Sequence, residues 1–192
     1  MNNSLPKYFI FVNHFDENIL KNNNTNLGVI YRNYSKKIDI NEIYIIRKYC
    51  KKKGYKFYIS NNFKLAVKCK ADGLYIPSFN RKILHTKFYS SENFKIIGSA
   101  HNKKEINNKI KQDCKIIFLS PIFKIKKSKY YLGISKFNLL TLNQNIHFAA
   151  LGGINKKNIK LLKMLNISAM AGINFYKKNR PNKLGRFYQY VI

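Results

Sequence analysis

The stretch HFAALGGINKKN, residues 147–158, joins a short apolar run to two adjacent glycines and a helix-like continuation. A continuous apolar run is typical of a strand that is buried on both faces. Gly152 and Gly153 lack a Cβ, so the backbone can turn sharply or approach another group closely there. Asn155 is predicted to cap a helix over 156–165. The stretch therefore predicts a strand–turn–helix unit, which either binds a phosphate through backbone N–H groups or is a tight turn without a ligand.

The same alternation of strand and helix runs through the whole chain. Short β-rich runs occupy 8–13, 27–34, 55–60, 73–77, 95–101, 115–123, 147–153 and 168–176, and the clearest helical patterns are 40–54, 102–114, 132–144 and 156–165. Alternating elements predict βαβ units around a parallel sheet. Eight strands favour a compact (βα)8 TIM barrel of the α/β class. An open doubly wound sheet is the alternative, but its dinucleotide fingerprint is missing. No linker divides residues 1–192, so we expect a single domain.

The chain carries a formal charge of +29, which taken alone suggests nucleic acid or an anionic surface as a partner. Only five of its 37 basic residues are arginines, and arginine is the usual choice for bidentate contacts to phosphates and bases. The lysines are spread along the chain and accompany abundant Asn and Ile, as is typical of an AT-rich genome. We therefore expect a solvated lysine surface and small phosphorylated substrates, rather than nucleic acid, as partners.

The sequence offers no membrane segment and no targeting signal. Its apolar runs have the length of strands, and the amino-terminal residues lack the pattern of a signal peptide. The three cysteines are widely spaced and have no zinc-binding pattern, which is typical of reduced thiols. We expect a cytoplasmic protein without a membrane partner. Whether it forms a homo-oligomer is left open.

Polar residues at the ends of the predicted strands are candidates for the site, because barrel enzymes place their sites at the carboxyl ends of their strands. Arg32 ends an apolar strand; it binds an anionic ligand or pairs with one of the few carboxylates. Ser99 and His101 are expected to face the mouth, where His101 serves as a general acid or base or has a structural role. The run 124–129 is rich in lysine and would suit a pyrophosphate.

Five motifs occur in an order that resembles one known family. They are ADGLYIP (71–77), GSAHNKKEI (98–106), SPIF (120–123), ALGGINKKN (150–158) and AMAGIN (169–174). From about Leu27 to Tyr176 the chain resembles the thiamine phosphate synthase and TenI family, as a divergent member. The resemblance implies a (βα)8 barrel and a transferase of thiamine biosynthesis. Such an enzyme joins hydroxymethylpyrimidine pyrophosphate to thiazole phosphate and releases pyrophosphate with the help of Mg²⁺.

The resemblance also implies roles for single residues, each by its place in a motif. It implies that Gly152, Gly153, Ile173 and Asn174 hold the thiazole phosphate or nearby groups. It implies that Arg32 binds the pyrophosphate and that Ser99 is a ligand of the substrate.

The chain departs from the family pattern at several of these places. Ile30 and Tyr34 replace a glutamine and a lysine on either side of Arg32. The aspartates that hold Mg²⁺ fall on Asn61 and Asn80. The threonines and the lysine that follow the PIF segment fall on Ile125, Lys127 and Ser128, of which Lys127 is retained as a candidate for substrate binding. An amide oxygen contributes only a dipole to a hard cation, so the two asparagines are expected to weaken Mg²⁺ binding greatly.

Three functions are considered, of which we expect the first. The first is the coupling synthase, in which Arg32 and the lysines of 124–129 would neutralise the leaving group without a metal. The second is a TenI-like thiazole tautomerase, which needs a group for proton transfer but no metal, and for which His101 is the candidate. The third is a non-catalytic binder of a phosphorylated ligand or of nucleic acid.

Overall fold

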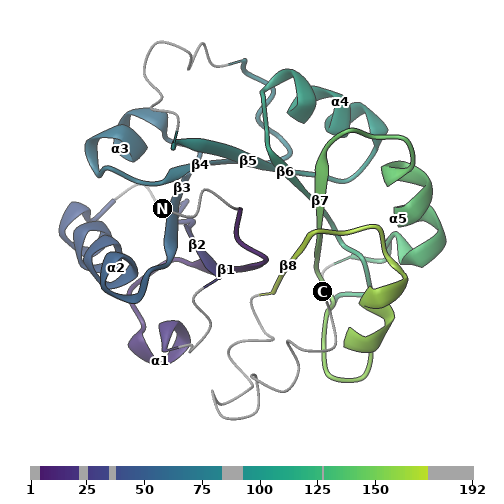
Figure 1. Cartoon of the computed structure of the whole chain (residues 1–192), viewed down its shortest axis with the longest axis horizontal. Coiled ribbons are helices and arrows are strands. Elements are labelled where there is room, and N and C mark those ends of the chain that lie inside the picture. Colours follow the sequence, from purple (N-terminus) through teal and green to yellow (C-terminus); the bar gives the residue numbers. More distant parts are fainter. Residues whose placement is uncertain (1–4, 22–25, 35–37, 84–92, 127, 173–192) are drawn as a thin grey trace.

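Eight parallel strands close into a barrel in the order of the sequence, β1 to β8, and β8 pairs with β1. The computed structural model describes residues 5–21, 26–34, 38–83, 93–126 and 128–172. The strands are β1 (Tyr8–Val12), β2 (Leu27–Tyr31), β3 (Lys56–Ser60), β4 (Gly73–Ile76), β5 (Lys95–Ala100), β6 (Ile116–Leu119), β7 (His147–Leu151) and β8 (Ala169–Ala171). Figure 1 shows this ring of strands. The predicted (βα)8 TIM barrel is confirmed.

Helices surround the ring on its outer side (Figure 1). They are α1 (Glu17–Leu20), α2 (Ile40–Lys53), α3 (Phe63–Lys68), α4 (Lys103–Lys111), α5 (Gly133–Thr141) and the 3₁₀ helix η2 (Ile159–Met164). The carboxylate of Asp39 caps α2 by accepting the N–H groups of Asn41 and Glu42, and Gly54 ends this helix in the left-handed conformation with φ 70°. Within the described part of the chain, no helix is long and apolar enough to span a membrane.

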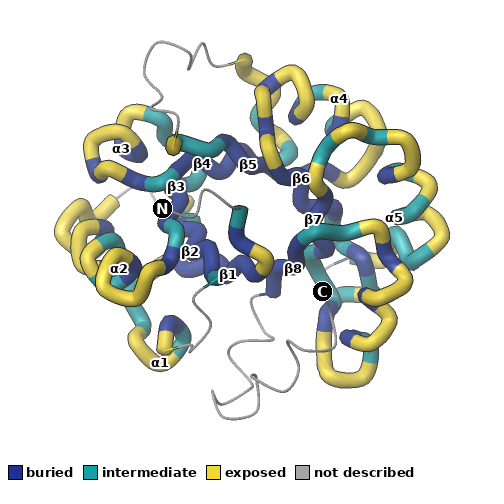
Figure 2. Tube along the Cα trace, in the orientation of Figure 1, coloured by how far each residue is buried: buried dark blue, intermediate teal, exposed yellow. Residues whose placement is uncertain are grey.

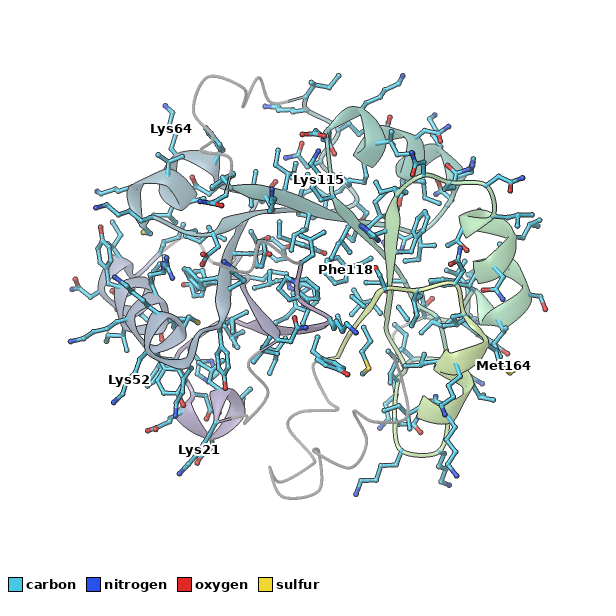
Figure 3. The ribbon with its side chains drawn as sticks, in the orientation of Figure 1. Lys21, Lys52, Lys64, Lys115, Phe118 and Met164 are labelled. Carbon is cyan, nitrogen blue, oxygen red and sulfur yellow. The ribbon has the colours of Figure 1, made fainter. Side chains whose placement is uncertain are left out.

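The interior of the barrel is packed with aromatic rings. Because side chains alternate along a strand, every second residue faces inward. The rings of Phe118 and Phe9 pack edge to face with 4.9 Å between their centroids, and those of Phe11 and Tyr75 do the same at 5.3 Å. Figure 3 shows Phe118 inside the ring of strands, whereas Lys21, Lys52 and Lys64 extend outward from the helical layer. Figure 2 shows the same division, with buried strands inside and exposed helix surfaces outside.

Several predicted elements are shorter in the structure, among them 27–34, 102–114 and 132–144, and two of them have an evident cause. The expected helix over 156–165 is a 3₁₀ helix that starts only at Ile159. Asn155 does not cap it; its Oδ1 accepts the N–H of Lys157 at 2.8 Å in a local turn. The expected strand over 115–123 ends at Leu119, and Pro121, which has no N–H to donate to the ladder, follows two residues later.

Candidate functional site

Arg32 lies at the mouth of the barrel, directly after β2. Its backbone N–H donates to the carbonyl of Val12 at 2.7 Å. Its guanidinium carbon lies 4.5 Å from the centroid of the Phe11 ring and 6.0 Å from that of Tyr34, a cation–π arrangement. Among the described residues, no carboxylate forms an ion pair with Arg32. The aromatic rings and a side-chain hydrogen bond with Tyr75 therefore hold the guanidinium in place, and no carboxylate of the described residues occupies its other donors.

A pocket of about 310 Å³ opens beside Arg32, between the carboxyl ends of β1 and β2. It is lined by Phe11, Val12, Asn13, His14, Ile19, Arg32 and Tyr34. Sequence reasoning did not select Asn13 and His14, although both follow the first strand directly and the strand-end rule would have found them.

The segment that follows β4, residues 77–82, contacts three neighbouring segments; we name it the β4 loop. The ring of Phe79 meets Tyr34 of the segment after β2, with 6.2 Å between the centroids. The amide of Asn80 donates to Oδ1 of Asn61, which follows β3, at 2.7 Å. Oγ of Ser78 lies 3.1 Å from Nε2 of His101. The β4 loop thus connects the segments that follow β2, β3 and β5 at the mouth of the barrel.

His101 follows β5, as the sequence predicts, and both of its ring nitrogens have partners. Nδ1 lies 2.6 Å from the carbonyl oxygen of Ser120, which can only accept a hydrogen bond. Nδ1 therefore carries a proton, and Nε2 is the ring nitrogen that lies beside the hydroxyl of Ser78. The carboxylate of Glu105 accepts the backbone N–H of His101 at 2.7 Å, and the side chain of Asn102 accepts that of Glu105, so these two side chains together cap the start of α4.

Ser99 is buried, and its Oγ accepts a hydrogen bond of 2.9 Å from the hydroxyl of Tyr75. Burial raises the pKa of Tyr75 to about 12, so this phenol stays protonated and keeps donating. The hydroxyl of Ser99 still has its own proton to donate. Nearby, the buried Oγ of Ser60, at the end of β3, has no hydrogen-bond partner within the described chain.

Gly152 and Gly153 both adopt positive φ, 92° and 77°. A Cβ at Gly153 would collide with the backbone carbonyl of Phe123, and one at Gly152 would come within 3.0 Å of Pro121. The turn thus needs glycines for packing against the segment after β6. The side-chain amides of Asn155 and Asn158 donate to the carbonyl of Gly153. The hydrogen bonds among the described residues leave the N–H groups of both glycines without an acceptor.

Several predicted residues cannot be placed. Lys127, Ile173 and Asn174 lie outside the described residues. Around position 127, the side chains of Lys124, Lys126 and Lys129 are exposed.

The residues at the two positions matched to metal ligands do not fit Mg²⁺. Oδ1 of Asn61 accepts from Asn80, and Oδ1 of Asn80 accepts the backbone N–H of Lys82 at 2.9 Å. Both amide oxygens are therefore engaged by protein donors, and neither carries the charge that a hard cation favours. In the described part of the chain, no three His, Cys, Asp or Glu side chains gather as a set of metal ligands.

The described carboxylates that make contacts serve the scaffold instead. Asp16 and Asp39 cap helices, Glu42 accepts the N–H of Phe15, Glu105 closes the turn at His101, and Asp113 pairs with Lys115. Asp72, which precedes β4 at the opposite end of the barrel, pairs with Arg47 at 3.3 Å and Lys56 at 3.8 Å. None of these carboxylates takes the place of a ligand at Asn61 or Asn80.

Two solved structures with the same fold align over nearly the whole chain. A thiamine phosphate pyrophosphorylase from Pyrococcus furiosus aligns with a TM-score of 0.74 and 17% identity, over 99% of this chain and 98% of that one. A 4-hydroxy-2-oxoglutarate aldolase aligns with a TM-score of 0.65 and 10% identity, over 96% and 92% of the two chains. At these identities the two structures support the fold alone.

Sequence comparisons identify the family. A thiamine-phosphate synthase of Prochlorococcus marinus is 39% identical over 129 residues, 66% of this chain. The protein of the same name from another strain of that species is 35% identical over 128 residues, 65% of this chain. The chain spans about a third of the length of these curated relatives, 36% and 37%. The model of the family described as "Thiamine monophosphate synthase" matches residues 27–175, so the chain belongs to the thiamine monophosphate synthase family, as the motifs predict.

Proposed function

We propose that this chain couples hydroxymethylpyrimidine pyrophosphate to thiazole phosphate. The observation that carries the proposal is Arg32, a cation without an acidic partner among the described residues, stacked on Phe11 beside a pocket of about 310 Å³. In the coupling step, the thiazole nitrogen forms a bond to the methylene carbon of the pyrimidine while the C–O bond from that carbon to pyrophosphate breaks. Pyrophosphate leaves with the bonding electron pair, so positive groups that are already in place at the mouth lower the barrier.

In this proposal, the residues at the mouth have separate roles. Arg32 binds the pyrophosphate, and the exposed lysines around position 127 add positive charge. The N–H groups of Gly152 and Gly153, which have no acceptor in the described chain, bind the phosphate of the thiazole. Ser99, Lys127, Ile173 and Asn174 remain proposed substrate ligands on the resemblance alone. The coupling step as proposed routes no charge through Mg²⁺, because the amides of Asn61 and Asn80 are engaged with the protein.

A thiazole tautomerase is the second candidate, and the geometry of His101 favours it. The carbonyl of Ser120 fixes the proton on Nδ1, so the lone pair of Nε2 faces the hydroxyl of Ser78. An imidazole oriented in this way can accept a proton at Nε2 and return it. Tautomerisation requires no leaving group, so it would depend on His101 and not on Arg32.

The two functions are separated by two assays, of coupling and of tautomerisation, with three variants. Arg32→Ala is expected to lower coupling about 100-fold, the effect of removing one fixed group that stabilises developing charge. Lys52→Ala, which removes an exposed charge from α2, is the control and should retain the rate. The coupling assay is run with Mg²⁺ and with EDTA. Coupling by Arg32→Ala at the wild-type rate would reject the role of Arg32. A wild type that forms no product in either condition, but loses tautomerase activity on His101→Ala, would favour the second function.

We also propose that the chain works in a reducing compartment such as the cytoplasm. Cys50, Cys69 and Cys114 are all free and buried, and no pair among them is bridged. Free buried thiols are typical of such compartments.

A further inference from the structure

A direct hydrogen bond joins the side chains of Asn61 and Asn80, which lie in the segments that follow β3 and β4. Oδ1 of Asn80 accepts the N–H of Lys82, which fixes the orientation of the amide and directs its NH₂ group to Oδ1 of Asn61. Asn61 is fixed in turn, because its backbone N–H donates to the carbonyl of Tyr75 at 2.8 Å. Its φ of 59° is a left-handed value that asparagine tolerates better than most residues. Both amides therefore have one defined arrangement.

Two carboxylates in the same places could not form this contact. An ionised carboxylate only accepts hydrogen bonds, so two of them facing each other require a cation or a proton between them. The amide of Asn80 supplies the missing donor itself. The pair is therefore closed and neutral, with no charge left for a divalent cation to balance.

A buried lysine anchors the β4 loop from the side of α4. Lys109 is fully buried, and its ammonium group donates to the carbonyl of Pro77, the carbonyl of Asn80 and Oε1 of Gln112, each at 2.8 Å. The amide of Gln112 donates to the carbonyls of Asn80 at 3.1 Å and Lys82 at 2.7 Å. These contacts fix the backbone on both sides of Asn80.

The position of the Lys109 ammonium group also determines whether the site favours a cation or an anion. Among the described residues, no carboxylate lies within ion-pair distance of Lys109. Three neutral acceptors bind this positive charge close to Asn80, and the carboxylate of Glu105 attracts it from beyond ion-pair distance. A second cation at Asn80 would be repelled by this ammonium group, and an anion would be attracted to it.

We propose that the Asn61–Asn80 hydrogen bond, anchored by Lys109, replaces a divalent cation at the mouth, so that the site binds a pyrophosphate group without metal. Only the identity of this anion rests on the proposed function. The hydrogen bond maintains the spacing of the two strand ends, and the ammonium of Lys109 contributes positive charge. Lys109 acts here as a positioning residue through Asn80, not as a catalytic residue.

The test measures two binding reactions of the full chain, without any turnover. Binding of Mn²⁺ alone is followed by the spectroscopic signal of the free ion, and binding of inorganic pyrophosphate is followed by calorimetry in EDTA. The wild type is expected to show no saturable Mn²⁺ binding and to bind pyrophosphate in EDTA. The double variant Asn61→Asp/Asn80→Asp is expected to bind Mn²⁺ at least about tenfold more tightly than the wild type, because carboxylates suit this class of cation. It should also lose about tenfold in affinity for pyrophosphate in EDTA, because two negative charges then face the anion.

Asn107→Asp is the matched control, because it adds a carboxylate at an exposed position of α4 away from the pair. It should behave as the wild type in both measurements. Saturable Mn²⁺ binding by the wild type as tight as that of the double variant would overturn the proposal, as would wild-type binding of pyrophosphate that disappears in EDTA. These two wild-type results decide the matter even if the double variant does not fold. Neither binding measurement involves coupling. A failed coupling assay therefore leaves the proposal of metal-free binding intact, and a failed binding test leaves the proposed coupling function intact.

Discussion

Lysine is used in two opposite ways around the mouth of this barrel. Lys109 is fully buried, and three acceptors surround its ammonium group. Lys124, Lys126 and Lys129, in the segment after β6, are exposed. The first lysine determines the shape of a loop through fixed hydrogen bonds, whereas the others supply charge that the solvent screens. The net charge of the chain therefore does not reveal which lysine matters to the fold.

Among the substitutions considered, removing the buried ammonium group of Lys109 should lower the free energy of unfolding the most. Lys109→Met keeps the apolar stem but leaves the carbonyl of Pro77 and Oε1 of Gln112 without their donor. Unpaired buried acceptors are costly, so the free energy of unfolding should fall by about 3 kcal/mol. Lys111→Met, at an exposed position of the same helix, is the control and should change it by less than about 0.5 kcal/mol. Urea unfolding of both variants measures the difference, and equal losses would remove the contrast between buried and exposed lysines.

The pH dependence of stability probes the same contrast. Burial lowers the pKa of Lys109 below its ordinary value of 10.5. Between the two pKa values the unfolded chain binds more protons at this residue than the folded chain, so its contribution to stability rises with pH. The stability of the wild type relative to Lys109→Met should therefore increase as the pH approaches 10.5. A constant difference over this range would mean that the pKa of Lys109 is the same in both states.

A smaller loss of stability is expected when either of two glycines with positive φ is replaced, one packed against another segment and one facing open space. Gly153→Ala adds a Cβ that collides with the carbonyl of Phe123, whereas Gly54→Ala, also at positive φ, meets no atom within 4 Å. Backbone strain alone should cost Gly54→Ala about 1 kcal/mol, and the collision should raise the cost at Gly153 to roughly 2 kcal/mol or more. Thermal unfolding measures both variants. Equal destabilisation would show that the segment after β6 moves aside easily.

The exposed lysines should matter least to stability. Replacing Lys124, Lys126 and Lys129 together by Ala should leave the free energy of unfolding nearly unchanged, because each side chain is exposed. The affinity for pyrophosphate should fall about tenfold at low salt, and the loss should shrink as salt screens the charges. Calorimetry at two salt concentrations tests this prediction. A loss that is independent of salt would indicate fixed contacts like those of Lys109.

Much of the framework was predictable, because it depends on patterns that are local in the sequence. The apolar runs indicated the eight strands in order, and Gly54 marked the end of α2 where the structure has it. The start of η2 was predicted too early, because the side chains of Asn155 and Asn158 bond to the turn rather than cap a longer helix. Arg32 and His101 were selected by the strand-end rule, and both lie at the mouth.

Hydrophobic alternation and motif order are properties of neighbouring residues, so they were enough to establish the barrel, the family and the charges available at the mouth. Which polar groups meet was settled only when the chain folded. Lys109 looks like any surface lysine of a helix, and its burial follows from packing α4 against β5, where Gly98 leaves room for its side chain. The contact between Asn61 and Asn80 likewise joins the ends of two different strands. Such pairings depend on how the strands close into a ring, so no local pattern specifies them.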